Sequence, residues 1–296
     1  HSSKNEVCRK FVSTSDYLER YSLNNDMTFI NVISRGKAYT MGNWDGPVLQ
    51  HGENNRIRYN HPCTLKNNKK ILLTSDYNNK DYFEIHSLES KKIIKRLKSS
   101  CGRVLSLKKS PTDDSFLIIN FKHELHILNI KSDKLTKVDR SKNTPLSANW
   151  SPCGKYITYS CSNNKKCRII KVYDLDKKKI HTITKSISSD SSPVFSPDGK
   201  YLAFLSNRTF KPIYDSIQFD LGFPKSDKPY LVILSKDTES PFIKNPNVKK
   251  DKKTKSKTKK SNKKIVTKID FKDIENRIIG LPVNESSLDS SIGFTK

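Results

Sequence analysis

The residues best suited to chemistry in this sequence are its cysteines, histidines and serines, and their spacing decides what they can do. The six cysteines include no C-x-x-C pair, whereas zinc ligands normally come in closely spaced pairs. Cys161 and Cys167 with a histidine remain a zinc candidate, but reduced structural thiols are the favoured interpretation. His123 and His126 would point to opposite faces of a strand, so one metal ion could not easily bind both.

Nucleophilic catalysis has no local signature in the sequence. It contains no G-x-S-x-G motif, no glycine-rich phosphate loop and no H-E-x-x-H motif, the patterns that position a nucleophile, a phosphate or a zinc ion. Serine and histidine are common enough to meet in space, but nothing marks a particular pair. The sequence therefore predicts no catalytic residue, no metal ligand and no cofactor site.

The elements that would position any site form a repeat. A turn followed by an apolar strand occurs at residues 150–157 and again at 195–202. In the second copy, Ser-Pro-Asp-Gly at 196–199 suits a type I turn, because proline presets φ and glycine accepts a positive φ. The corresponding turn residues are Asn25, Asn68, Asp114, Gly154 and Gly199, at intervals of 43, 46, 40 and 45 residues. Recurrence at this period is typical of β-propeller blades.

A second series of segments runs in phase with the first. Alternating strands at 83–88, 125–130 and 170–175 each end in a polar turn and a lysine-bearing return, which predicts an outer hairpin. A β-sandwich with regular turns is the alternative, but two series in phase at blade length favour a propeller. Strands that are apolar on both faces agree, because blades stack face to face. We predict an all-β fold of four-stranded blades, as in WD40 and TolB-like repeats.

The predicted blades occupy only part of the chain. About five repeats lie in residues 1–244, a lysine-rich linker or insertion follows at 245–264, and residues 265–296 are expected to begin a further blade. The chain starts at His1 without a methionine, and neither end shows a capping strand. An incomplete ring would leave sheet edges unpaired, so we expect the sequence to be a fragment of a larger propeller.

The net charge of +26 suggests nucleic acid as a possible partner. Its sharpest source is the run 249–264, with ten lysines and one aspartate. A solvated linker is the favoured interpretation, and phosphate-backbone binding is the alternative. Removing the run leaves 46 basic and 29 acidic residues, and only 11 of the 56 basic residues are arginine. Nucleic-acid sites favour arginine, so a general bias toward lysine explains the charge better.

The sequence does not predict a membrane protein. Its longest apolar runs, such as residues 116–119, are far shorter than the roughly 18 residues that cross a bilayer. Residues 1–20 carry scattered charges in place of a signal-peptide core. We therefore expect a cytoplasmic protein with no membrane span.

Several segments depart from the blade template and carry a family resemblance. They are SRGKAY at 34–39, WDGPVLQHG at 44–52, RIRY at 56–59, LSNR at 205–208, KPY at 228–230, DTESPF at 237–242 and IDFKDIENRIIGLPV at 269–283. An insertion at 207–224 delays the outer hairpin of the last repeat. In order and spacing these segments resemble the tricorn protease family over nearly the whole chain. The lysine content and the basic linker are departures from that family.

The resemblance implies a large cytosolic serine peptidase that trims peptides released by the proteasome or similar proteases. Such an enzyme has two propellers, a PDZ-like domain and a catalytic core, and it assembles into a hexamer. This chain would be part of the second, seven-bladed propeller, which is thought to admit unfolded peptides to the core. The family's catalytic serine and histidine lie downstream of the propellers, so no catalytic residue is carried onto this chain.

One residue is a candidate for contact with a peptide in the propeller channel. Arg35 lies at a strand end beside Gly36, where a guanidinium would meet backbone carbonyls or a peptide carboxylate. A structural arginine bonded to loop carbonyls is the alternative. Trp44 and His51 carry the resemblance too, and we expect them to pack and to fix loops.

Three functions remain open at this point. The first is the substrate-guiding propeller of a serine peptidase, which requires PDZ-like and catalytic segments downstream. The second is a non-enzymatic propeller scaffold for protein partners, whose reading frame would end soon after a closing strand. The third is a nucleic-acid-binding protein, whose binding would weaken steeply with salt. The family resemblance favours the first.

Overall fold

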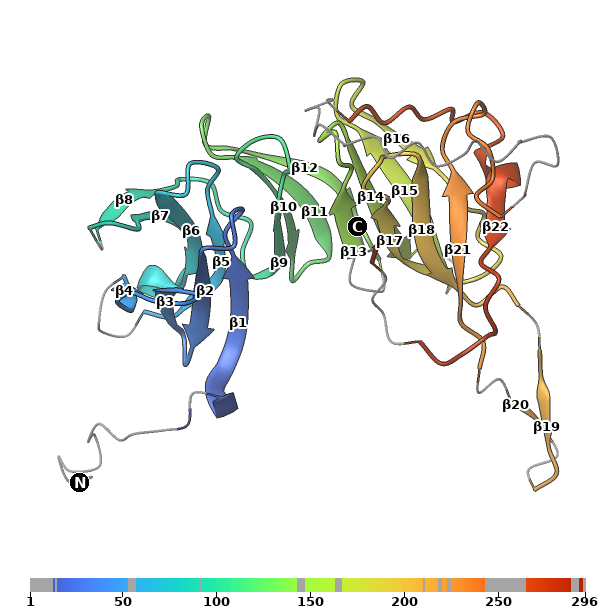
Figure 1. Cartoon of the computed structure of the whole chain (residues 1–296), viewed down its shortest axis with the longest axis horizontal. Coiled ribbons are helices and arrows are strands. Elements are labelled where there is room, and N and C mark those ends of the chain that lie inside the picture. The colour runs from blue at the N-terminus through green and yellow to red at the C-terminus, as the bar shows by residue number, and fades with distance from the viewer. Residues whose placement is uncertain are drawn as a thin grey trace, which may run out of the picture. The chain divides into compact units, whose positions relative to one another are not determined.

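The fold is built from antiparallel β-strands (Figure 1). The computed structural model describes residues 13, 15–52, 57–90, 92–142, 147–162, 167–209, 211–217, 220–222, 225–242, 265–288 and 293–294. In this part of the chain the strands form five four-stranded sheets and one two-stranded sheet. The helices described there are short 3-10 helices, and none has the length and apolar character needed to cross a membrane. The prediction of four-stranded β units is confirmed.

The first three sheets each use four consecutive strands. Sheet one consists of β1 (Leu18–Leu23), β2 (Phe29–Ser34), β3 (Lys37–Gly42) and β4 (Leu49–His51). Sheet two consists of β5 (Tyr59–Thr64), β6 (Lys70–Ser75), β7 (Tyr82–Ser87) and β8 (Ile93–Arg96). Sheet three consists of β9 (Val104–Lys109), β10 (Ser115–Asn120), β11 (Glu124–Asn129) and β12 (Lys134–Arg140).

The last two sheets follow the same order with one insertion. Sheet four consists of β13 (Ser147–Trp150), β14 (Tyr156–Ser162), β15 (Arg168–Asp174) and β16 (Lys179–Thr182). Sheet five consists of β17 (Asp190–Phe195), β18 (Tyr201–Ser206), β21 (Lys228–Ile233) and β22 (Ile278–Gly280). The hairpin of β19 (Ile213–Asp215) and β20 (Asp220–Gly222) is inserted before β21. The 3-10 helices are η2 (Ser15–Tyr17), η3 (Tyr77–Asn79) and η4 (Ile274–Arg277).

The predicted turns connect the first two strands of sheets four and five. The N–H of Gly199 donates to the carbonyl of Ser196 (2.9 Å), and the Ser196 hydroxyl accepts the N–H of Tyr201 (2.9 Å). Gly199 has a φ of 71° and the equivalent Gly154 a φ of 70°, a conformation that glycine adopts without steric cost. The turn chemistry predicted for these positions is confirmed.

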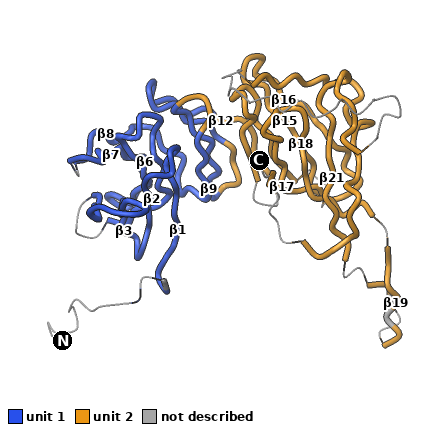
Figure 2. The backbone as a smooth tube through the Cα atoms, in the orientation of Figure 1, with its two compact units in different colours: residues 1–109, 114–121, 126–136 blue, residues 110–113, 122–125, 137–296 orange. Residues whose placement is uncertain are grey.

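The chain divides into two compact units (Figure 2). Unit 1 comprises residues 1–109, 114–121 and 126–136, and unit 2 comprises residues 110–113, 122–125 and 137–296. The division passes through sheet three. Sheets one and two therefore belong to unit 1, and sheets four and five belong to unit 2.

Sheets pack face to face within each unit. In unit 1, one apolar core that includes Ile33 and Leu73 lies between sheets one and two, and Phe83 and Phe116 lie in a second core between sheets two and three. In unit 2, the core between sheets four and five includes Phe204. Burial of each such side chain contributes roughly 1.5–3 kcal/mol. Stacking of this kind is how propeller blades bury both faces of their strands.

The first strand of each sheet is a sheet edge, and within each unit these edges lie side by side. In unit 1, β1 contacts β5 and β5 contacts β9, and in unit 2, β13 contacts β17. Two of these strands contain a bulge in which a residue of positive φ precedes a proline. The pairs are His61 (φ 49°) with Pro62 in β5, and Ser192 (φ 52°) with Pro193 in β17. Proline has no N–H to donate, so edge strands and bulges are where a sheet tolerates it.

Sheet five is completed by a strand that the sequence analysis assigned to a different blade. β22 pairs with β21 (Figure 1), and Asp227 forms a further antiparallel bridge with Ser286. The Lys211 amine also lies 3.2 Å from a Glu285 oxygen. This pairing differs from the expectation that residues 265–296 begin a further blade, because a long insertion separates the two strands in sequence. The lysine-rich run at 249–264 lies outside the described residues.

Candidate functional site

A polar cleft of about 380 Å³ lies in unit 1 where the first strands begin. Its walls come from the starts of β5 and β9, the end of β6 and the turn between β2 and β3. We call it the rim cleft. Its charged lining residues are Glu19, Arg58, Asp76, Asp81 and Arg103. The mixture of both signs suits a ligand that carries both charges.

Two of these carboxylates also fix the backbone around the rim cleft. Glu19 Oε1 accepts the N–H of Gly36 at 3.0 Å, and Asp76 Oδ1 accepts the N–H of Arg58 at 2.7 Å. Burial raises the pKa of Asp81, the Arg103 charge opposes that shift, and the Asp76 charge reinforces it. Asp76 and Asp81 therefore act on each other electrostatically, and together they would favour a positively charged group.

A second cleft of about 390 Å³ runs along β1, β5 and β9 in unit 1. Its charged lining residues are Glu19, Arg20 and Lys108. We call it the wall cleft. Glu19 and His61 line both clefts, so the two lie next to each other along the first strands.

His61 stands between the two clefts as a neutral group. Its Nε2 lies 3.2 Å from the Leu105 carbonyl, which can only accept, so Nε2 carries the proton. Its Nδ1 then accepts from the Thr74 hydroxyl at 3.2 Å. Burial, together with the Arg20 charge, lowers the pKa of His61 to about 4. At neutral pH His61 therefore adds no charge to either cleft.

Arg20 is held beside His61 by the same carbonyl. Its Nη2 donates to the Leu105 oxygen at 3.4 Å, and in the described part of the chain Arg20 forms no ion pair. Lys108 lines the same cleft, and burial lowers the pKa of its amine. The wall cleft thus carries two basic side chains, and the one carboxylate in its described lining is the shared Glu19.

Arg35 lies in the two-residue turn between β2 and β3. Both Arg35 (φ 50°) and Gly36 (φ 69°) have positive φ, as a type I′ hairpin turn requires. The Arg35 side chain is exposed, and its guanidinium lies 5.3 Å from the centre of the Tyr17 ring. Gly36 lines the rim cleft and Arg35 does not. Arg35 is therefore placed beside the cleft, on an aromatic surface.

A sequence profile described as "Tricorn protease second beta propeller domain" matches residues 18–295. The chain belongs to the tricorn protease family. The predicted family and the predicted β-propeller fold are confirmed together.

Individual tricorn relatives agree with the profile. A Sulfurisphaera tokodaii protein named "Putative Tricorn-like protease C-terminal subunit" is 34% identical over 277 residues, which cover 93% of this chain and 30% of the relative. A "Tricorn protease homolog" of Saccharolobus solfataricus is 32% identical over 235 residues, covering 79% of this chain and 21% of the relative. A structure titled "Crystal structure of the tricorn protease" superimposes with a TM-score of 0.73 at 21% identity, covering 92% of this chain and 26% of that chain. The chain spans less than a third of each of these proteins.

The candidate zinc ligands do not form a site in the described part of this tricorn propeller. Cys161 is buried in β14, Cys167 is half-buried, and both are free thiols. His126 is buried within β11, and His123 directly precedes that strand. Across the described residues, no group of three or more His, Cys, Asp or Glu side chains could hold a metal ion.

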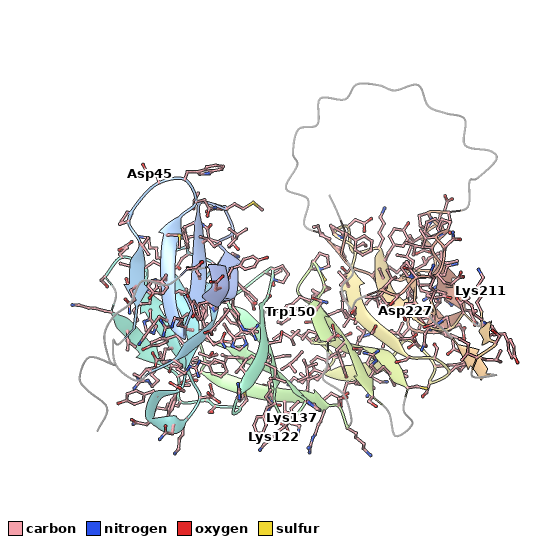
Figure 3. The ribbon with its side chains drawn as sticks, turned by 90° about the horizontal axis from the view of Figure 1, so that it is seen from below. Asp45, Lys122, Lys137, Trp150, Lys211 and Asp227 are labelled. Atoms are coloured by element: carbon pink, nitrogen blue, oxygen red, sulfur yellow. The ribbon has the colours of Figure 1, made fainter. Side chains whose placement is uncertain are left out.

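The two other residues singled out with the tricorn resemblance differ in role. His51 is fully buried, and its Nε2 lies 2.8 Å from the Thr40 hydroxyl, which in turn donates to Asn31 at 2.7 Å. His51 thus fixes the outer strand of sheet one, as predicted. Trp44 is 95% exposed in the loop that also carries Asp45 (Figure 3). The prediction that Trp44 packs is wrong, because the β3–β4 loop holds it away from the sheet core.

Sheet two contains a buried ionic cluster that was not predicted from the sequence. Glu84 accepts from Ser75 Oγ at 2.6 Å and from Arg96 Nε at 2.9 Å, and its other oxygen lies 2.9 Å from His86 Nε2. Burial alone would raise the pKa of Glu84, but these three hydrogen bonds outweigh it and hold the pKa below its usual range. The signal in the sequence was Glu84 two residues before His86, which puts both on one face of an otherwise apolar strand.

The LSNR motif has a structural role in unit 2. Arg208 Nη2 donates to both oxygens of the fully buried Asp190, at 3.0 and 2.9 Å, and its Nε donates to Ser206 at 3.0 Å. The guanidinium also lies 5.0 Å from the centre of the Tyr230 ring. Asn207 accepts the N–H of Ser189 at 2.8 Å. The motif therefore joins the start of β17 to the end of β18.

Proposed function

We propose that this chain is a non-catalytic part of the second propeller of a cytosolic tricorn-like serine peptidase, and that it guides unfolded peptides toward a catalytic core elsewhere in the protein. The observation that carries the proposal is the pair of neighbouring polar clefts along β1, β5 and β9. Membership of the tricorn family supports the peptidase part of the proposal.

The chemistry of the clefts suits an extended peptide. Charged groups of both signs offer partners to the amides and to the two termini of a peptide. A cleft of about 390 Å³ has room for a few residues and excludes a folded domain. Selection by size needs no catalytic group, so the lack of a catalytic motif in the sequence is consistent with this role.

Two further elements of the proposal rest on the family resemblance. The enzyme would act on peptides released by the proteasome or similar proteases, and it would assemble as a hexamer. A non-enzymatic scaffold remains the second candidate, because a propeller presents loops to protein partners whether or not a catalytic core follows.

The experiment is hydrolysis of a panel of short fluorogenic peptides by two proteins. One is this 296-residue chain, and the other is the product of the full reading frame, with a serine-directed inhibitor as the control. We expect inhibitor-sensitive cleavage by the longer protein alone. No peptide cleavage by either protein would contradict the peptidase proposal and favour the scaffold.

Arg35 gives a residue-level prediction for this function. We propose that its exposed guanidinium contacts the passing peptide, so Arg35→Ala in the full-length protein should lower kcat/KM for peptides roughly three- to tenfold. Arg140→Ala, which removes an exposed arginine from another sheet, is the matched control. Unchanged turnover in Arg35→Ala would show that Arg35 only supports its turn.

A further inference from the structure

The rim and wall clefts lie next to each other and differ in charge, and we call the pair the trough. They share Glu19 and His61, and each has charged residues of its own. At the rim end, Asp76 and Asp81 accompany two arginines. At the wall end, Arg20 and Lys108 are the unshared charged residues in the described lining, and both are basic. The electrostatic potential therefore rises from the rim toward the wall.

Arg20 is the residue best placed to bind a carboxylate at the wall end. The Leu105 carbonyl takes one hydrogen of the guanidinium, which leaves donors of the planar fork for a ligand. Arg20 is exposed and makes no ion pair with the described residues, so a carboxylate would not have to displace a competing acid. His61 beside it is neutral, so it neither strengthens nor weakens the attraction between the Arg20 guanidinium and a carboxylate.

The basic residues that line the trough are mostly arginine, although the chain as a whole favours lysine. Only 11 of the 56 basic residues are arginine, yet Arg20, Arg58 and Arg103 all line the trough. Lysine would supply the same charge, but it lacks the planar pair of donors that matches a carboxylate. Three of the four basic residues in the described lining of the trough are therefore arginine, the side chain whose donors match a carboxylate.

We propose that the trough holds a peptide in one direction, with its C-terminal carboxylate at Arg20 and its amino group beside Asp76 and Asp81. This inference rests on the proposed peptide-guiding function. It adds that the carboxyl end of the peptide lies along the first strands while the amino end lies at the rim.

The test is the affinity of matched fluorescent peptides for the full-length protein, with its serine nucleophile blocked by the inhibitor. One five-residue sequence is used as the free acid, as the C-terminal amide, and as the free acid with an acetylated N-terminus. We expect the free acid to bind about tenfold more tightly than the amide, the size of one charge-assisted contact. Acetylation should weaken binding by a smaller factor, because the rim also contains arginines.

Substitutions test whether the preference for a free C-terminal carboxylate arises in the trough. Arg20→Gln should bind the acid and the amide equally, Arg20→Lys should retain part of the preference, and Asp81→Asn should reduce only the effect of acetylation. Arg140→Gln is the control and should bind as the unmodified protein does. Equal affinity of the unmodified protein for acid and amide would overturn the proposal, and so would an equal loss for both peptides in Arg20→Gln.

A carboxylate can also come from an acidic side chain. A peptide amide with glutamate as its last residue separates the two sources. If that peptide binds the protein as tightly as the free acid does, the site binds any carboxylate and the proposed direction is overturned. The proposed function has its own readout in the hydrolysis experiment, so peptide cleavage without an acid preference would refute this inference alone.

Discussion

Glu84 holds three side chains in place from inside sheet two. Its oxygens bind Ser75, His86 and Arg96, and the Arg96 guanidinium lies 3.6 Å from the centre of the Tyr77 ring in η3. Each of these partners lies on a different strand or loop of unit 1. A single carboxylate therefore connects the middle strands of the sheet to the loop beside the rim cleft.

Replacement of this carboxylate should be costly. Glu84→Gln keeps the volume but removes the charge opposite Arg96, and removal of one partner from a buried pair typically costs about 3 kcal/mol of unfolding free energy. Urea unfolding followed by fluorescence measures the change. Glu89→Gln is the matched control, because Glu89 is exposed and pairs with Lys69 at 3.8 Å. An equal and small effect of both changes would contradict the role given to Glu84.

The same carboxylate predicts the response to acid. Because the folded-state pKa of Glu84 lies below its usual value, its stabilising contribution is complete above the unfolded pKa and is lost as the pH falls through the folded pKa. Unfolding free energy measured from pH 7 to pH 3 should fall more in the unmodified chain than in Glu84→Gln. Parallel pH profiles of the two proteins would refute this account.

At the scale of single elements, the turns before the second strands carry stability through their glycines. A side chain at Gly199 would face a φ of 71°, and its Cβ would lie 2.4 Å from the Thr267 hydroxyl. Both effects oppose folding, and the left-handed conformation alone costs roughly 1–2 kcal/mol. This turn therefore tolerates glycine far better than any other residue.

We expect Gly199→Ala to lower the unfolding free energy by at least about 1 kcal/mol. Gly280→Ala is the control, since a Cβ there meets Tyr230 at an ordinary distance of 3.4 Å and φ is not positive. Thermal unfolding of both variants gives the comparison. A Gly199→Ala protein as stable as Gly280→Ala would show that the turn relaxes without cost.

The elements differ in how far the sequence predicts them. The turn at 196–199 was predictable because its chemistry is local, and the strand after it is apolar throughout. The pairing of β22 with β21 was not, because the partners are separated by an insertion and β22 has only three residues. The trough was not predictable either, since Arg20 lies in β1 while Arg58 and Arg103 directly precede β5 and β9, the first strands of two other sheets. Only the three-dimensional packing of the first strands brings them together.

At the scale of the whole molecule, the described residues of unit 1 leave side chains on one face of sheet one exposed. Sheet one packs on sheet two through the face that carries Ile33 and Ala38. On its other face the register aligns Tyr21 with Val32 and Leu23 with Ile30, and Tyr21 is 67% exposed. Propeller blades bury both faces, so we expect a further blade of the full-length protein to cover this one.

This expectation predicts that one substitution changes the unfolding free energy of the two proteins by different amounts. Tyr21→Ser should change the unfolding free energy of the 296-residue chain by no more than about 0.5 kcal/mol. In the full-length protein it should cost roughly 2 kcal/mol, because a buried aromatic ring is lost. Met27→Ser, at an equally exposed turn position, is the control for both. Equal stability changes in the two proteins would place the Tyr21 face in solvent.

The proline bulge of β5 also determines how strongly a peptide in the wall cleft would adhere to the strand edges of unit 1. A bare strand edge is a template on which an unfolded chain pairs and stays. In unit 1, Pro62 has no amide hydrogen to offer, and the Leu105 carbonyl already accepts from His61 and Arg20. An unfolded chain would therefore find few backbone hydrogen-bond partners along this cleft. Its charged ends would orient it, and it would not add to the sheet as a further strand.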